Sequence, residues 1–317
     1  MAYQHLSVMP NEVMAHLNCK ANGTYIDCTL GGAGHSRRIL EQLGPDGLLV
    51  GIDRDMDALA NARNVLKPFE ANTRLFHNNF ISLPDILSGI GIGAVDGILL
   101  DLGLSFNQIV NSGRGFSFNA DEPLDMRMDA AASTATAEDI INDTDEEGLA
   151  DLFWKYGEER FSRRIARQIV HARKDKRIRS SSELAGIIQH AVPAKPSKHR
   201  KIHPATRVFM ALRIAVNHEL ENLETFLGNV VELLNPEGRL LVISFHSLED
   251  RVVKHRIRDL ASSCTCPPQF PQCVCNRTPK VRIISRKAIM PTPEEIDANP
   301  MARSARLRVA EKLPSTF

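Results

Sequence analysis

The chain has 317 residues, 43% of them hydrophobic and 24% charged, and a formal net charge of +1. Its length allows one large domain or two smaller ones, and its composition excludes a disordered or fibrous protein. It contains no run of eighteen uncharged apolar residues and no basic segment before an apolar run near Met1, so we expect a cytoplasmic protein without a membrane segment.

The first informative segment is an apolar run that leads into a glycine-rich turn. Thr24–Cys28 is predicted as a strand, the turn Gly31–Gly34 follows it, and a helix is predicted from about His35. The next apolar run, Leu48–Ile52, ends on Asp53, nineteen residues after the last glycine of that turn. Such a turn lets a nucleoside approach the backbone, and an acid at the next strand end accepts hydrogen bonds from ribose. The pattern therefore predicts a nucleoside-cofactor enzyme.

The glycine spacing bears on which cofactor is bound. Dinucleotide-binding turns read Gly-x-Gly-x-x-Gly, and the third glycine position holds Arg37 here. A long side chain there is expected to spoil close packing between helix and strand. S-adenosylmethionine has no phosphates and carries a cationic sulfonium, so it suits a turn with fewer glycines and acidic surroundings. We favour that cofactor, with a dinucleotide oxidoreductase as the alternative.

Further apolar runs alternate with helical stretches. Three more strands are predicted, at Arg74–His77, Gly97–Asp101 and Arg239–Phe245. This alternation predicts a mostly parallel sheet with helices on both faces, and a ligand outside the carboxyl ends of the strands.

More than a hundred residues separate the last two of these strands, and they carry helix signals. Thr144-x-x-Glu147 predicts a capping box for a helix that ends at Gly157, and Ser180 predicts the start of another. Apolar residues from Phe209 to Leu223 predict one long helix. We therefore predict an all-helical domain over 110–216, inserted into a sheet domain made of 1–109 and 217–317.

Positive charge is concentrated in this insertion. Residues 151–215 contain 16 Lys and Arg against 5 Asp and Glu. In the helix after Phe161, basic side chains fall opposite an apolar stripe, and a basic linker, Pro193–Pro204, follows later. Such an excess is typical of binding to a polyanion, although a solvated surface paired with acids elsewhere is the alternative. The residues predicted to contact RNA are Arg163, Arg164, Arg167, Lys198, Arg200 and Lys201.

Four of the six cysteines form two Cys-x-Cys pairs, at Cys264, Cys266, Cys273 and Cys275. Four thiols in twelve positions make a tetrahedral zinc site one interpretation, but zinc ligands usually follow Cys-x2-Cys. Reduced loop cysteines are the other interpretation.

Nine segments together carry a family resemblance over nearly the whole chain. They are Asp27–Ser36, Gly51–Asp55, Asp96–Gly103, Arg114–Phe118, Pro123–Asp129, Tyr156–Phe161, His203–Arg207, Ile243–Arg251 and Ala302–Arg308. In this order they resemble the bacterial small-subunit (16S) rRNA cytosine-N4 methyltransferases. The resemblance implies a Rossmann-like α/β sheet with an inserted helical domain. It also implies methyl transfer from S-adenosylmethionine to the exocyclic amine of a decoding-centre cytosine, with the 16S rRNA of the small ribosomal subunit as partner.

The resemblance also implies site residues. The methionine end of the cofactor is expected to contact Ala33, Gly34 and His35, and its ribose is expected to bond to Asp53. The adenine is expected to lie against Phe80, and Asp101 and Gln108 are expected to complete the pocket. The family usually reads Asp-Leu-Gly-Val-Ser-Ser-Pro-Gln where this chain has Asp-Leu-Gly-Leu-Ser-Phe-Asn-Gln at 101–108, which leaves Gln108 the least secure contact. Asp101 is also the candidate acceptor for a proton of the cytosine amine, with a role in fixing the cofactor as the alternative.

Three further points stay open at this level. His246 follows a predicted strand and either lines the substrate pocket or fixes a loop, the second being the more common role. Asp125 and Asp129 either face the sulfonium or pair with arginines. A ribosome-assembly protein that keeps the fold and binds RNA without turnover is the second hypothesis for function.

Overall fold

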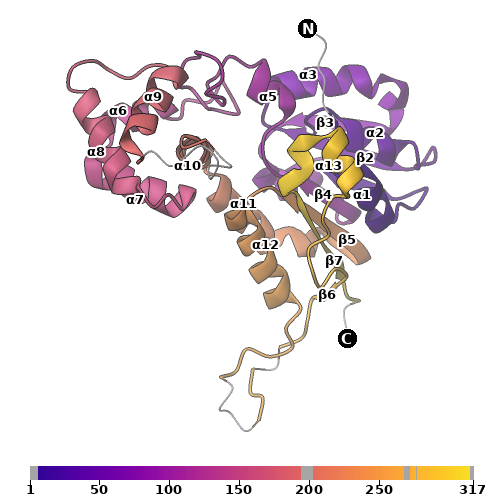
Figure 1. The fold of residues 1–317 in the computed structure, drawn as a ribbon. Coiled ribbons are helices and arrows are strands. Elements are labelled where there is room, and N and C mark those ends of the chain that lie inside the picture. Colours follow the sequence, from indigo (N-terminus) through magenta and orange to yellow (C-terminus); the bar gives the residue numbers. More distant parts are fainter. Residues whose placement is uncertain (1–5, 194–202, 268–271, 276, 315–317) are drawn as a thin grey trace. The chain divides into compact units, whose positions relative to one another are not determined.

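The computed structural model describes residues 6–193, 203–267, 272–275 and 277–314. The chain divides into two compact units, drawn with their elements in Figure 1. The first combines Met1–Gly103 with Leu220–Phe317, and the second is Leu104–Glu219. The boundaries expected from the sequence, residues 110 and 216, fall inside the second unit.

The first unit is built on a seven-stranded sheet in the order β3-β2-β1-β4-β5-β7-β6. The strands are β1 Thr24–Asp27, β2 Leu48–Asp53, β3 Thr73–His77, β4 Val95–Asp101, β5 Leu234–Ser244, β6 Val281–Ile283 and β7 Arg306–Lys312. The first five are parallel, whereas β7 is antiparallel to both β5 and β6. The predicted Rossmann-like sheet is confirmed, and the two C-terminal strands, which the apolar runs did not predict, extend it.

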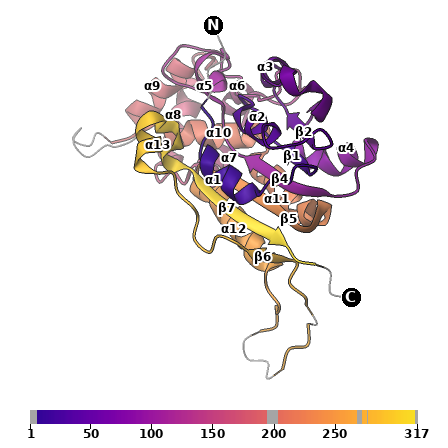
Figure 2. The same cartoon turned by 90° about the vertical axis from the view of Figure 1, so that its right-hand side faces the viewer.

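Helices cover both faces of this sheet, as Figures 1 and 2 show. They are α1 Pro10–Leu17, α2 Gly34–Leu40, α3 Met56–Val65, α4 Leu83–Gly89, α11 Glu219–Asn229, α12 Ser247–Leu260 and α13 Pro293–Ala298. Successive strand residues point to opposite faces. Leu49 and Leu99 therefore pack with α1, α2 and α3, while Val50 and Ile98 pack with α4, α11 and α12.

The second unit has helices joined by loops, with no strand among its described residues beyond the isolated bridge of Pro123 with Ser180. Its helices are α5 Phe106–Val110, α6 Ala137–Asp143, α7 Glu146–Gly157, α8 Ser162–Ala172, α9 Ser181–Ala191 and α10 Thr206–Asn217. They enclose a separate apolar core, in which Phe153, Ile165, Leu184 and Leu212 are fully buried. Among all described helices, none combines the length and apolar character needed to cross a membrane.

One predicted helix start is shifted. The capping box at Thr144 is wrong, because the N-cap of α7 is Asp145, whose side chain accepts from the Gly148 amide at 2.8 Å. Both residues are good caps, and the backbone selects the second of them. The start predicted at Ser180 is confirmed, since its hydroxyl accepts from the Glu183 amide.

The long helix predicted through Phe209 and Leu223 is two helices. The chain breaks at His218, which takes the left-handed conformation with φ of 51° between α10 and α11. The neighbouring Asn217 is buried, and its amide bonds the Met126 carbonyl and the Met128 N–H, each at 2.8 Å. A left-handed residue costs about 1–2 kcal/mol, and apolar periodicity along the chain carries no sign of these compensating contacts.

Candidate functional site

The sheet of the first unit has a topological switch point at β1. From there the chain order runs outward through β2 to β3 on one side and through β4 to β5 on the other. In open α/β sheets a ligand binds outside the carboxyl ends of the strands at such a point. Three neighbouring strands of the sheet end on acids, which we call the rim acids: Asp27 on β1, Asp53 on β2 and Asp101 on β4.

The glycine-containing turn follows β1 on this rim. Gly31 has a φ of 46° and Ala33, the N-cap of α2, a φ of 61°, so the chain turns through two left-handed residues. A side chain at Gly34 would collide with the Ser7 hydroxyl. The Gly31 amide donates to Asp53 Oδ2 at 2.9 Å. The turn and the end of β2 are therefore held together by the carboxylate that the sequence assigned to the ribose.

Asp53 keeps acceptor capacity for a ligand. Its Oδ1 accepts from the Asp55 amide at 2.9 Å, and the Arg54 amide also donates to the carboxylate. A carboxylate offers about four acceptor positions in all. Burial raises the pKa of Asp53 to about 6, although the hydrogen bonds from backbone N–H groups oppose this rise. The remaining acceptor position suits a hydroxyl group of a ribose.

Asp27 is a rim acid to which sequence reasoning gave no role. Its side chain is fully buried and accepts from the Ser36 hydroxyl at 2.6 Å and the Thr29 amide at 3.2 Å. Burial raises the pKa of Asp27 to about 7. The available signal was an acid within the apolar run that precedes the glycine turn, since an acid seldom occupies a central strand without a purpose.

Asp101 is the rim acid best suited to a cation. Its amide is held by Thr29 Oγ1 at 2.8 Å, and its Oδ2 lies 3.7 Å from His35 Nε2. Its Oδ1 is buried, and no donor within the described part of the chain reaches it. Burial, with the negative charges of Asp27 and Glu249, raises the pKa of Asp101 well above its usual value. A buried acid with an open acceptor fits the positively charged groups of S-adenosylmethionine.

The other predicted cofactor residues are distributed between the two units. His35 is buried in the first turn of α2. Phe80 follows β3 and packs edge-on against Phe226, with ring centroids 5.2 Å apart. Gln108 belongs to the second unit, where its Oε1 accepts from the Ser105 amide at 3.0 Å in a capping box. Six of the seven predicted residues thus lie in the first unit and Gln108 in the second, and the assignment of all seven to the cofactor stays a prediction.

The packing argument from Arg37 is wrong. Its side chain is 60% exposed, and its Nε pairs with Glu41 Oε1 at 2.9 Å along the outer face of α2. It therefore does not reach the strand, and this residue does not argue against a dinucleotide.

Two of the open points are answered by hydrogen bonds. His246 is the N-cap of α12 and accepts from the Glu249 amide, while its Nε2 lies 3.1 Å from Glu249 Oε1. Asp125 pairs with the Arg127 guanidinium through both oxygens, at 2.8 and 2.7 Å. His246 thus has a structural role at a helix start, and Asp125 is committed to an arginine.

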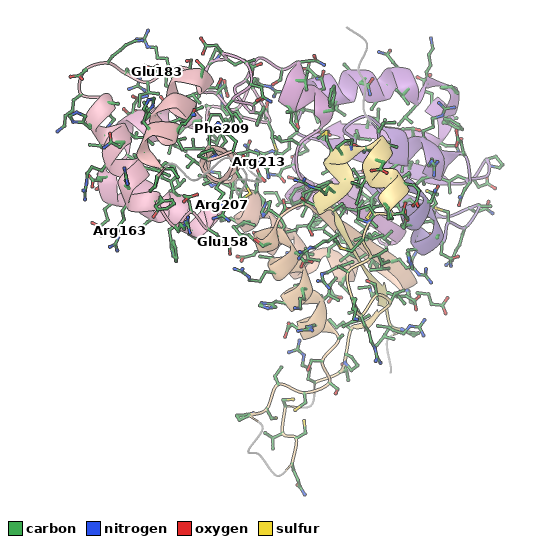
Figure 3. The ribbon with its side chains drawn as sticks, in the orientation of Figure 1. Glu158, Arg163, Glu183, Arg207, Phe209 and Arg213 are labelled. Carbon is green, nitrogen blue, oxygen red and sulfur yellow. The ribbon has the colours of Figure 1, made fainter. Side chains whose placement is uncertain are left out.

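The basic residues predicted on the second unit lie on α8. Arg163, Arg164 and Arg167 are exposed there, opposite the buried Ile165 and Ile169, and Figure 3 labels Arg163. Of these three, only Arg167 forms an ion pair with an acid among the described residues, with its Nε 3.5 Å from Glu146 Oε1 in a largely exposed contact. The other predicted RNA contacts, Lys198, Arg200 and Lys201, lie outside the described residues, and the four cysteines of 264–275 lie in the loop between α12 and β6.

A Rossmann-like sheet with a glycine-containing turn and buried acids at its switch point defines an α/β enzyme that binds a nucleoside cofactor. Comparison with known proteins narrows this class. The family model of the MraW methylase family matches residues 2–313, and the chain belongs to this family. It is therefore a methyltransferase whose methyl donor is S-adenosylmethionine.

Curated relatives match over their full length. A protein of Desulforapulum autotrophicum named ribosomal RNA small subunit methyltransferase H is 56% identical over 310 residues, covering 98% of this chain and 99% of the relative. One of Desulfosudis oleivorans with the same name is 54% identical over 313 residues, covering 99% and 100%. A crystal structure described as an rRNA methylase from Streptococcus thermophilus has a TM-score of 0.40 at 10% identity, covering 96% and 95%.

Proposed function

We propose that this protein methylates the N4 exocyclic amine of a decoding-centre cytosine in the 16S RNA of the small ribosomal subunit. Two findings support the substrate: membership of the methylase family and the shared name of the curated relatives. The observation that carries the reaction is the buried rim of β1, β2 and β4, where Asp101 presents an open acceptor.

Each rim residue has a distinct part in this proposal. S-adenosylmethionine supplies an electrophilic methyl group on a sulfonium. Asp53 accepts hydrogen bonds from the ribose, and Asp101 attracts the cationic end of the cofactor. The turn residues Ala33, Gly34 and His35 hold the methionine end, Phe80 flanks the adenine, and Gln108 completes the pocket.

The amine of cytosine needs help to react, because its lone pair is delocalised into the ring. The site must hold N4 in line with the bond from sulfur to methyl and accept a hydrogen bond from it. We assign that acceptance to Asp101, because burial raises its pKa well above the usual value and no donor among the described residues reaches its Oδ1. Methyl transfer would form a bond between N4 and the methyl carbon and break the bond from sulfur to that carbon, and ionised Asp101 would accept the proton that N4 releases.

The second unit is proposed to hold the RNA. An exposed basic face on α8, made by Arg163, Arg164 and Arg167, matches the phosphate contacts that such a substrate requires. The cytosine must leave its stack to reach a buried rim, so contacts to the flanking phosphates would stabilise the opened strand. The charge excess of residues 151–215 is consistent with this role.

The test is methyl transfer from radiolabelled S-adenosylmethionine to small subunits from cells that lack this protein. We expect one cytosine per subunit to gain a methyl on N4, located by nuclease mapping and mass spectrometry of the nucleoside. Naked 16S RNA and assembled subunits are assayed side by side to define the substrate. A methyl group on another base contradicts the assignment, and cofactor binding without any transfer indicates an assembly protein instead.

A further inference from the structure

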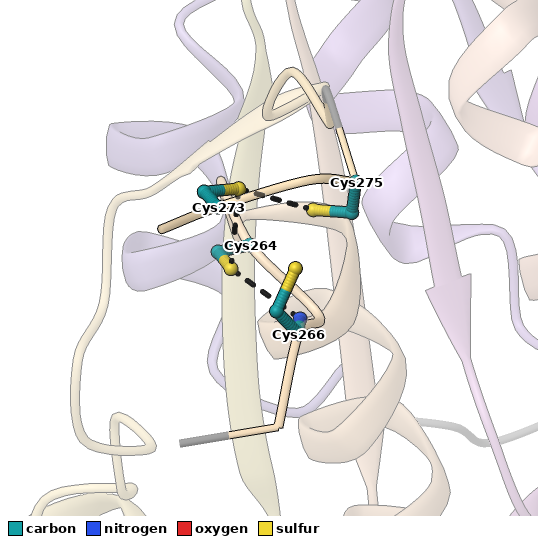
Figure 4. Close-up of side chains that lie close together, drawn as sticks. All are labelled: Cys264, Cys266, Cys273 and Cys275. Carbon is teal, nitrogen blue, oxygen red and sulfur yellow. Dashed lines mark hydrogen bonds between the residues drawn. The ribbon is translucent and has the colours of Figure 1, made fainter. Parts of the chain in front are cut away.

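The loop between α12 and β6 brings four thiols together outside the site described above. We call Cys264, Cys266, Cys273 and Cys275 the loop cysteines. Their four sulfur atoms all lie within 4.8 Å of one another, and none is in a disulfide. Figure 4 shows the two Cys-x-Cys segments facing each other with their sulfurs turned inward.

The spacing of these sulfurs matches a metal site better than a disulfide. Cys273 Sγ lies 3.5 Å from both Cys264 Sγ and Cys275 Sγ. Four sulfurs at about 2.3 Å from a central zinc ion stand roughly 3.8 Å apart in a tetrahedron. A disulfide requires about 2.05 Å, so the distances between these sulfur atoms are close to the first value and far from the second.

Backbone amides surround the sulfurs in a reciprocal pattern. The Thr265 amide donates to Cys275 Sγ at 3.5 Å, and the Val274 amide donates to Cys266 Sγ at 3.4 Å. The middle residue of each Cys-x-Cys segment therefore donates to the last cysteine of the other segment. Amide donors of this kind favour thiolate over thiol, because they stabilise the negative charge of metal-bound sulfur.

Within its described residues, the loop is held near its base by polar contacts, among them the Arg277 guanidinium with the carbonyl and carboxylate of Asp259. Its base is pinned where the Lys280 amide donates to the Leu260 carbonyl at 2.8 Å. Beyond that point, Cys264 and Cys273 are exposed, and Val274 is 67% exposed. The described residues of this segment bury little apolar surface, so hydrophobic packing contributes little to their stability. A bound metal ion would supply folding free energy in its place.

We propose that the loop cysteines bind one Zn²⁺ ion in a closed tetrahedral site that orders the loop between α12 and β6. Four protein ligands leave no open position for water or substrate, so the role is structural. The tight Cys-x-Cys spacing does not oppose this, since each segment contributes two sulfurs and the facing segment completes the tetrahedron. This zinc site shares no residue with the proposed methyl-transfer site or with the proposed RNA-binding face of α8.

The test is the metal content of the full-length protein purified without chelator or affinity metal. We expect one zinc ion per chain by inductively coupled plasma mass spectrometry. We also expect the zinc to be released stoichiometrically when a mercurial reagent titrates the thiols. Cobalt(II) in place of zinc should give the visible bands of a tetrahedral tetrathiolate. C264S and C273S should each lose the zinc and make the loop sensitive to protease.

The matched control is C19S, because Cys19 lies outside the loop and burial raises the pKa of its thiol to about 12. This variant should keep its zinc. Circular dichroism should show that all three variants retain the folded core, so that loss of zinc reports on the site. Absence of zinc from the wild type, iron in its place, retention of zinc in C273S, or a mass shift showing disulfides would each overturn the proposal.

Discussion

The three rim acids at the switch point lie where water is largely excluded. Burial raises the pKa of Asp27 to about 7 and that of Asp53 to about 6, and burial with the negative charges of Asp27 and Glu249 raises the pKa of Asp101 well above its usual value. An ionised buried carboxylate is costly unless something compensates it. The rim is therefore poised to gain free energy from a ligand that brings positive charge and hydroxyl donors.

The ribose assignment predicts a pH-dependent affinity. As pH rises through about 6, Asp53 ionises, and its hydrogen bonds to hydroxyl groups become charge-assisted and stronger. Affinity for S-adenosylhomocysteine, measured by calorimetry, should therefore rise between about pH 5 and about pH 7, a range that brackets the pKa of Asp53. D53N should weaken binding roughly 10- to 100-fold and flatten this dependence. The control D57N removes an exposed acid on α3, and its affinity should match the wild type.

The role of Asp101 predicts a separation between binding and turnover. If it accepts a hydrogen bond from the reacting amine, D101N should lower the single-turnover rate roughly 100-fold or more, beyond any loss in cofactor affinity. A rapid-quench assay at saturating cofactor measures the rate, and calorimetry measures the affinity. An equal rate with weaker cofactor binding would show that this carboxylate only fixes the cofactor.

Among the secondary-structure elements, α12 and β7 are joined by ion pairs in which Asp250 and Arg308 are largely buried and Arg306 is 45% exposed. Asp250 on α12 accepts two hydrogen bonds from β7. Arg308 Nε donates to it at 2.6 Å, and Arg306 Nη1 donates to it at 2.9 Å. Burial alone would raise the pKa of Asp250, but these two arginines lower it below its usual value. The stabilisation is present at neutral pH and is lost as pH falls through the lowered pKa of the folded state.

Breaking this pair should destabilise the first unit. D250N should lower the free energy of unfolding at pH 7 by about 3 kcal/mol, because it leaves two arginines without their buried partner. Urea denaturation measures the change, and the difference from wild type should shrink as pH falls below about 4. D259N is the control on the same helix: its side chain is 42% exposed beside Arg256, and its loss should cost less than about 1 kcal/mol. Equal effects of the two changes would refute the distinction.

The exposed face of α8 predicts the salt dependence of RNA binding. Replacing Arg163, Arg164 and Arg167 with glutamine should weaken affinity for small-subunit RNA and reduce the slope of log K against log salt by roughly 2 to 3. A matched triple change, R63Q with K67Q and R74Q, removes the same charge from exposed positions in the first unit. If both triple variants bind alike in filter-binding assays, α8 is ordinary surface.

For the molecule as a whole, the two units have separate cores. The apolar clusters that flank the sheet draw on the first unit alone, and the cluster around Phe153 draws on the second alone. The second unit is also one continuous stretch of chain, whereas the first is made of two. This organisation predicts that the second unit folds by itself.

Residues 104–219 expressed alone should give a helical circular dichroism spectrum and one cooperative thermal transition. F153A in this fragment should be destabilised by about 3–5 kcal/mol, because that ring is fully buried in its core. The fragment should also retain RNA affinity with the salt slope of the full chain. Gradual melting without a transition would show that the insertion depends on the first unit.

The sequence by itself determined the parallel strands, the glycine turn, the acids Asp53 and Asp101 and the basic face of α8. These features are local, because apolar runs, strand-end acids and helical periodicity are properties of neighbouring residues along the chain. Only the tertiary structure decided the break at His218, the role of Asp27, the outward path of Arg37 and the convergence of the loop cysteines. Each of these depends on contacts or burial supplied by distant segments, which no local pattern encodes.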